Sequence, residues 1–158
     1  MIVVDVNILA FHFIQGEKTE RVKALRAVDA EWVVPEFWLV EFQSILWKYV
    51  RFGGMPEGQA LDLLDRCRNL IASNENTPVP DRALSDAIAF GISVYDAQYI
   101  SLAKQLGIAC ITEDTLLHKA CPGLALSIND YIAFRSDRSS LREKRKSYRP
   151  GSKRSNPS

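Results

Sequence analysis

Short apolar runs alternate with helical patterns along the first 130 residues, and this alternation limits the fold more than any other feature. Strand candidates are IVVDV (2–6), WVVP (32–35), IACIT (108–112) and ALSIN (125–129). The spacing of apolar residues predicts helices over 17–30, 36–54, 56–71, 81–91 and 93–107, and a short one from 114. A Pro-containing connection is expected at 75–80. Strands separated by helices are typical of an α/β fold with a mainly parallel central sheet.

The N-terminal stretch MIVVDVNILAF (1–11) has the apolar, β-branched character of a buried strand. One carboxylate, Asp5, lies within it. Burying an isolated carboxylate costs several kcal/mol unless a partner compensates for it. The residue therefore needs a specific explanation.

Charge divides the 158 residues into two parts. Residues 1–134 contain 11 Lys/Arg and 17 Asp/Glu, a formal charge of −6. Residues 135–158 contain 9 Lys/Arg and 2 Asp/Glu, a formal charge of +7. The C-terminal part has only two large apolar residues, Leu141 and Tyr148. It buries too little apolar area to offset its ordering entropy. We therefore predict one domain over 1–134, followed by a disordered basic tail over 135–158.

No window approaches the roughly 18–20 apolar residues of a membrane helix, and the first residues lack the basic region and cleavage site of a secretory signal. The three cysteines, Cys67, Cys110 and Cys121, are odd in number and far apart, which favours reduced thiols over a disulfide framework or zinc site. We expect a cytoplasmic protein without membrane association.

Four acidic residues interrupt apolar patterns: Asp5, Glu41, Asp96 and Asp114. Asp5 and Asp114 follow strand candidates, and ligands of parallel sheets gather at the carboxyl ends of the strands. Carboxylates that converge in apolar surroundings need a counter-charge. Mg²⁺, with Mn²⁺ as the alternative, prefers such oxygen ligands, and the isolated positions of both histidines argue against zinc. An all-oxygen site suits metal-assisted hydrolysis of phosphodiesters.

Each acid also has a purely structural explanation. Ser93 and Asp96 match the S-x-x-D capping box. Thr112 or Asp114 could cap the helix that follows, and Asp5 could accept backbone N–H groups of a tight turn. Glu41 would lie on a narrow polar stripe of its helix. These explanations are four separate ones, whereas a single metal pocket accounts for all four residues.

The segments VVDVNILAF, PEFWLVEFQSIL, SVYDAQYISLAKQLG and ACITEDTLL resemble, in order and spacing, the acidic motifs of PIN-domain nucleases. They resemble most of all the VapC-type toxins of bacterial and archaeal toxin–antitoxin pairs. The resemblance covers about residues 1–130. It implies a three-layer α/β/α fold with a central, mainly parallel sheet. It also implies a Mg²⁺-dependent endoribonuclease that forms a homodimer and is inhibited by a cognate antitoxin.

The resemblance also implies roles for individual residues. The catalytic and metal-binding positions are Asp5, Glu41, Asp96 and Asp114. Asp5 and Asp96 are expected as direct ligands with Asp114 next, and Glu41 is expected to act through a water on the metal. Asn7 and Thr112 match neighbouring polar positions that support the site and its substrate. Ser44 stands where the family often has Asn, which puts the way Glu41 is held in question.

Other functions stay open at this point. One is a PIN-like module that binds RNA or protein without cleavage, and another is a PIN nuclease that is not a toxin. A haloacid-dehalogenase-like phosphatase needs D-x-D, but Asn7 replaces the second acid. A receiver domain would need a second acid beside the first strand, whereas Glu41 and Asp96 lie in helical patterns.

Positive charge for RNA must come from the tail and from residues such as Lys48, Arg51, Arg66, Arg68, Arg82 and Lys104. The apolar segment 36–52 is either a core helix or a surface for a second copy or an antitoxin.

Overall fold

A computed structural model describes residues 1–147 of the chain, with side chains for residues 1–138. Its centre is a parallel sheet with the strand order β3-β2-β1-β4-β5. The strands are β1 (Ile2–Val4), β2 (Trp32–Pro35), β3 (Glu75–Asn76), β4 (Cys110–Ile111) and β5 (Ala125–Leu126). The predicted mainly parallel sheet is confirmed.

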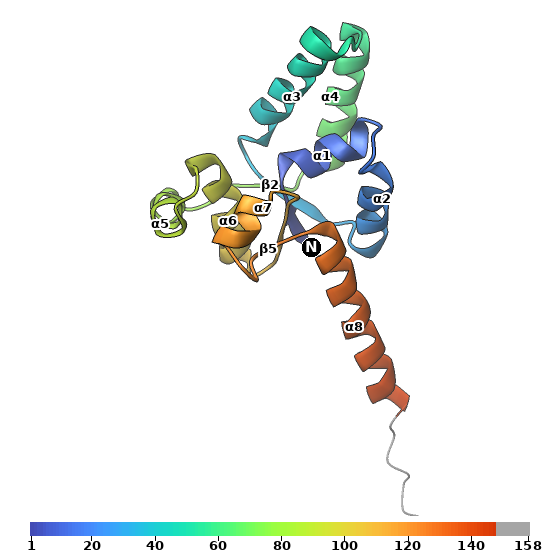
Figure 1. Ribbon diagram of the computed structural model, residues 1–158, viewed down its shortest axis with the longest axis vertical. Coiled ribbons are helices and arrows are strands. Elements are labelled where there is room, and N and C mark those ends of the chain that lie inside the picture. Colours follow the sequence, from blue (N-terminus) through green and yellow to red (C-terminus); the bar gives the residue numbers. More distant parts are fainter. Residues whose placement is uncertain (148–158) are drawn as a thin grey trace, which may run out of the picture.

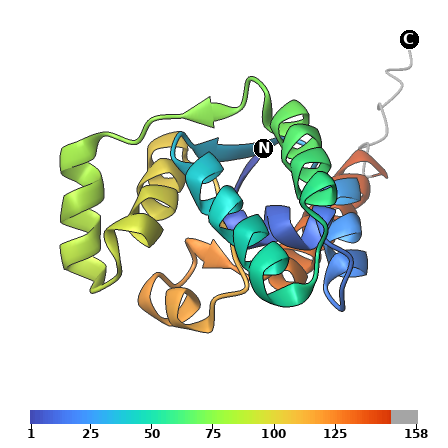
Figure 2. The same ribbon diagram turned by 90° about the horizontal axis from the view of Figure 1, so that it is seen from above.

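Helices cover both faces of this sheet, and the three-layer α/β/α architecture is confirmed. The helices are α1 (Val6–Phe13), α2 (Thr19–Val28), α3 (Trp38–Gly53), α4 (Glu57–Ile71), α5 (Pro80–Phe90), α6 (Val94–Leu106), α7 (Thr115–Ala120) and α8 (Ile128–Ser147). Figure 1 shows α5 and α6 on one side of the strands and α1 to α4 on the other. Turned by 90°, the strands lie between these two groups of helices (Figure 2).

The N-terminal apolar stretch divides at Asp5, so the strand predicted over 2–6 is shorter than expected and the rest of the stretch is helical. Strand β1 ends at Val4, and α1 begins at Val6. Asp5 is the N-cap of α1 in an extended conformation. The helix is buried along much of its length, for example at Ile8 and Leu9. Apolar periodicity does not separate a short buried helix from a buried strand, because both present a continuous apolar run.

Two shorter stretches also differ from the sequence prediction. The connection at 75–80 contributes the edge strand β3, which pairs with β2. The last strand ends at Leu126, and α8 begins at Ile128, inside the segment predicted as strand. Strands this short carry too few residues to show the alternation by which a strand is recognised.

Helix α8 corrects the expectation of disorder from residue 135, because it continues to Ser147. Its first turns are anchored to Asp29 of the body. The Tyr131 hydroxyl donates a 2.8 Å hydrogen bond to Asp29, and Arg135 lies 3.7 Å from the same carboxylate. An anchored first turn removes the nucleation cost, and Arg, Lys, Glu and Leu then extend a helix readily. Figure 1 shows α8 projecting from the body.

The part of the predicted tail over 148–158 lies outside the described residues. The predicted division of the chain at residue 134 falls inside α8, and a separate tail after that point stays a prediction.

Helix α3 has both a buried face and an exposed apolar face, so the core role predicted for segment 36–52 is observed and the role as a surface for a partner stays a prediction. One face buries Trp38, Phe42 and Leu46 in the core. The other face exposes Trp47 and Phe52, whose side chains are 58% and 74% accessible. Helices α3 and α4 form a pair that extends away from the sheet (Figure 1).

The three cysteines are unpaired and buried, as predicted for reduced thiols. Among residues 1–147, no helix combines the length and apolar character needed to cross a membrane.

Candidate active site

The neighbouring strands β1 and β4 end at the same edge of the sheet and place Asp5 beside Thr112. The Asp5 N–H donates to the carbonyl of Ile111 at 2.9 Å, which fixes the backbone there. The Thr112 hydroxyl donates a 2.7 Å hydrogen bond to Oδ2 of Asp5, and the Asn7 N–H donates to Oδ1 at 3.2 Å. Both carboxylate oxygens of Asp5 are thus held in place.

Asp114 lies close to this pair but uses its carboxylate to cap a helix. Its N–H donates to the Thr112 hydroxyl oxygen at 3.1 Å. Its Oδ1 accepts the N–H groups of Leu116 and Leu117 at 2.8 and 3.4 Å, at the start of α7. The structural explanation for Asp114 is therefore observed, and Thr112 links this residue to Asp5.

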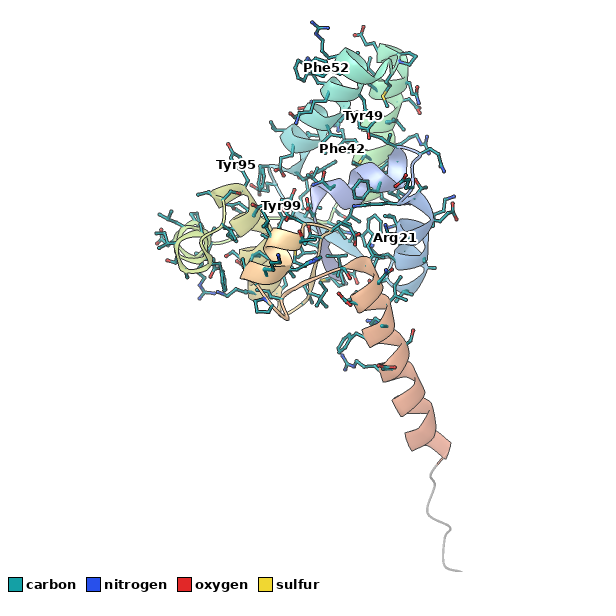
Figure 3. The ribbon with its side chains drawn as sticks, viewed as in Figure 1. Arg21, Phe42, Tyr49, Phe52, Tyr95 and Tyr99 are labelled. Carbon is teal, nitrogen blue, oxygen red and sulfur yellow. The ribbon has the colours of Figure 1, made fainter. Side chains whose placement is uncertain are left out.

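Glu41 enters from the first turn of α3 and is held by a residue of α6. The buried hydroxyl of Tyr99 donates a 2.6 Å hydrogen bond to Oε2 of Glu41. Figure 3 shows Tyr99 near the centre of the molecule, with Tyr95 further out on the same helix. Within the described residues, Ser44 makes no hydrogen bond to Glu41, so Tyr99 positions this carboxylate instead.

Asp96 lies in the first turn of α6, where Ser93 is the N-cap as predicted, but the Asp96 carboxylate accepts from the Ser93 hydroxyl and not from the backbone N–H of a capping box. The Ser93 hydroxyl donates to Oδ2 of Asp96 at 2.6 Å, and the Asp96 N–H donates back to the same hydroxyl at 3.1 Å. These two hydrogen bonds fix the Asp96 carboxylate and leave it near the other acids, because the charge of Asp96 acts on both Asp5 and Glu41.

Burial and neighbouring negative charge raise the pKa values of two of these acids, Asp5 and Glu41. Burial raises the pKa of Asp5, and the charge of Asp96 adds to the increase. Burial also raises the pKa of Glu41, and the charges of Asp5 and Asp96 add to it. The hydrogen bonds from Thr112 and Tyr99 act in the opposite direction. Among the ion pairs of the described residues, none joins a Lys or Arg to these three acids.

The donor set fits a hard divalent cation in chemistry and charge, since it offers carboxylate oxygens that lack a basic partner. The arrangement of these side chains is more open than the coordination sphere of a metal ion. In the part of the chain that the structure describes, no three Asp, Glu, His or Cys side chains form a group that could hold a metal ion.

The PIN domain family matches residues 2–121, which include all four acidic positions. The chain belongs to the PIN domain family. This membership confirms the resemblance that the four motifs carry.

Relatives of this PIN domain include Ribonuclease VapC3 of Pyrobaculum aerophilum, with 26% identity over 126 residues that cover 78% of this chain and 96% of the relative. The crystal structure of PAE2754 from Pyrobaculum aerophilum has a TM-score of 0.67 at 21% identity, covering 86% of this chain and 96% of that one. FitAcB from Neisseria gonorrhoeae has a TM-score of 0.62 at 18% identity, with coverages of 81% and 98%. These structural similarities show a shared fold.

One residue of the PIN domain site was missed from the sequence. Tyr99 follows Asp96 by three positions in YDAQYISLA, and residues three apart lie on the same side of a helix. The spacing could have identified it as a neighbour of the site.

Two of the predicted basic residues form ion pairs with acids other than the four predicted site residues. Lys104 pairs with the buried Asp86, and Arg66 pairs with Asp62.

Proposed function

We propose that this PIN domain is a Mg²⁺-dependent endoribonuclease and the toxin of a toxin–antitoxin pair, with Mn²⁺ as the alternative ion. The observation that carries the proposal is the set formed by Asp5, Glu41 and Asp96. These carboxylates repel one another at the carboxyl edge of the sheet, and no basic residue of the described chain is paired with them. The similarity to Ribonuclease VapC3 supports RNA as the substrate.

In this proposal the acids have two roles, as direct metal ligands or as a residue that acts through a water. Asp5 and Asp96 would hold the ion directly, Asp114 would be the next ligand, and Glu41 would act through an intervening water. When bound, a divalent cation neutralises charge on the phosphate and activates water for in-line attack, which leaves a 5′-phosphate and a 3′-hydroxyl.

Residues around the acids fix their positions and protonation. Thr112 has no exposed surface, so it orients Asp5 and does not contact substrate. Asn7 is exposed beside Asp5 and remains the proposed substrate contact. Tyr99 favours the ionised form of Glu41, because its hydroxyl donates to the carboxylate.

The exposed face of α3, formed by Val40, Trp47 and Phe52, is the proposed surface for a cognate antitoxin or a second copy of the chain. The rings of Trp47 and Phe52 pack edge to face at 5.7 Å while remaining exposed. Exposed apolar patches of this kind mark interaction sites. The three unpaired thiols support a reducing compartment, and we place the protein in the cytoplasm.

The test is cleavage of a 5′-labelled single-stranded RNA by the purified full chain, in Mg²⁺ and in EDTA. Asp5→Asn and Asp96→Asn should each reduce cleavage by about 100-fold or more while the circular dichroism spectrum is retained. Asp62→Asn is the matched control, because Asp62 is an exposed acid on α4.

Cleavage at the wild-type rate by Asp5→Asn would overturn the carboxylate site. RNA binding without cleavage under any of these conditions would favour the non-cleaving module.

A further inference from the structure

A second feature lies beside the carboxylates and takes no part in holding them. It is a cavity of about 320 Å³ between the start of α3, the segment after β3 and the start of α6. Its lining includes Phe37, Tyr95, Gln98, Glu36 and Thr77. This volume is at the lower end for ligand pockets, which suits one small planar group.

The cavity is connected to the acids by adjacent residues. Tyr95 immediately precedes Asp96, and Phe37 lies one helical turn before Glu41. The Phe37 ring contacts the Tyr95 ring at 6.0 Å and the Tyr99 ring at 5.6 Å, measured between centroids. Three aromatic rings therefore run from the cavity to the hydroxyl that holds Glu41.

Tyr95 contributes little to the core, because 67% of its side chain is accessible. Figure 3 shows it projecting outward from the start of α6. Bases of single-stranded RNA stack on exposed aromatic side chains of this kind. A base stacked on Tyr95 would place its own phosphate next to Asp96.

Polar groups in the cavity can contact the edge of a base. The Thr77 hydroxyl donates a hydrogen bond to Glu36 and orients its carboxylate, which has further lone pairs to offer. Among the hydrogen bonds of the described residues, none uses the side-chain amide of Gln98. A carboxylate accepts adjacent N–H donors, and an amide donates to a carbonyl oxygen. Guanine offers two adjacent donors, N1–H and N2–H₂, beside the O6 acceptor.

We propose that this cavity binds one nucleobase of single-stranded RNA, with guanine preferred, and thereby selects the bond that is cut. The inference rests on the proposed function for its substrate. Tyr95 and Phe37 supply the stacking surface, and Glu36 and Gln98 contact the base edge.

The first experiment measures binding in EDTA, where cleavage is absent. Fluorescence anisotropy compares labelled octauridine with the same octamer carrying one central guanosine. The guanosine should tighten binding to the wild-type chain about tenfold. Tyr95→Ala should abolish this preference, Tyr95→Phe should retain it because stacking needs only the ring, and Glu36→Gln should weaken it. Tyr49→Ala is the matched control, since Tyr49 is an exposed tyrosine on α3.

Equal binding of the two octamers by the wild-type chain would overturn the inference. So would a guanosine preference that survives in Tyr95→Ala. If Tyr95→Ala instead changes the oligomeric state in sedimentation and leaves the preference intact, the cavity belongs to a protein interface.

The second experiment maps cleavage positions on a mixed-sequence RNA in Mg²⁺. Cut sites should lie beside guanosine in the wild type and lose this bias in Tyr95→Ala. Cleavage with unchanged positions in Tyr95→Ala would overturn the base pocket and leave the nuclease proposal standing. A guanosine preference in EDTA without cleavage in Mg²⁺ would overturn the nuclease proposal and leave the pocket standing.

Discussion

The Thr112 hydroxyl donates a 2.7 Å hydrogen bond to Asp5 across 107 residues of sequence. The bond joins the ends of the neighbouring strands β1 and β4 at the point where the acids gather. Because Thr112 is fully buried and also accepts the N–H of Asp114, one hydroxyl orients two of the four acidic positions.

Thr112→Val keeps the shape of the side chain but removes this hydroxyl. The Asp114 N–H loses its acceptor, and the free energy of unfolding should fall by about 1–3 kcal/mol. The pKa of Asp5 should rise further, because the lost hydrogen bond holds it down. Urea denaturation measures the first effect, and the pH dependence of cleavage measures the second. Thr112→Ser should restore both, and a stable Thr112→Val with an unchanged pH profile would contradict the positioning role.

Asp5→Asn should stabilise the metal-free protein at neutral pH by about 1 kcal/mol, because it removes a buried, repelled charge. The pKa of Asp5 is raised in the folded chain above its ordinary value of 3.8. At pH values between 3.8 and the raised pKa, the folded state binds more protons than the unfolded state, so the stability of the wild type falls as pH rises. The advantage of the variant should therefore disappear as pH falls towards 3.8.

Thermal denaturation in EDTA from pH 3.5 to 8 tests this expectation. Adding Mg²⁺ should raise the melting temperature of the wild type more than that of Asp5→Asn, because an ion that binds only the folded state stabilises it. A variant less stable than the wild type at neutral pH in EDTA would refute the repulsion argument.

Tyr99→Phe removes the hydroxyl that donates to Glu41. The pKa of Glu41 is raised by burial and partly restored by this hydrogen bond, so its loss should raise the pKa further. The acid limb of the kcat/KM profile should move to higher pH, and the rate near pH 6 should fall about tenfold.

Tyr131→Phe is the control for Tyr99→Phe. Tyr131 is also buried and donates to a carboxylate, that of Asp29. Loss of the Tyr131 hydroxyl should lower the free energy of unfolding by about 1 kcal/mol without moving the pH profile of cleavage. A shift of the profile in both variants would assign the effect to general destabilisation.

The basic C-terminal segment should contribute phosphate contacts that do not depend on sequence. Deleting residues 136–158 removes eight Lys/Arg and two Asp/Glu. The slope of log Kd against log salt for single-stranded RNA should decrease by about 2 or more. Replacing the same eight basic residues by Gln in the full chain separates charge from length. An unchanged slope in both variants would show that the segment takes no part in RNA binding.

The sequence by itself determined the α/β alternation, the parallel sheet and the four acidic positions. It could do so because apolar periodicity and misplaced charge are local properties of the chain. The sequence also offered Ser93 and Asp114 as N-caps, and both caps are observed, since capping depends on neighbours within three positions.

Only the tertiary structure decided where Asp5 ends the strand, because a buried helix and a buried strand share one apolar pattern. It also decided that Tyr99 holds Glu41, through a contact between residues 58 positions apart. Helix α8 extends past residue 134 because Asp29, far away in sequence, anchors its first turns. Long-range contacts of this kind depend on how the elements pack, and no local window of sequence contains that information.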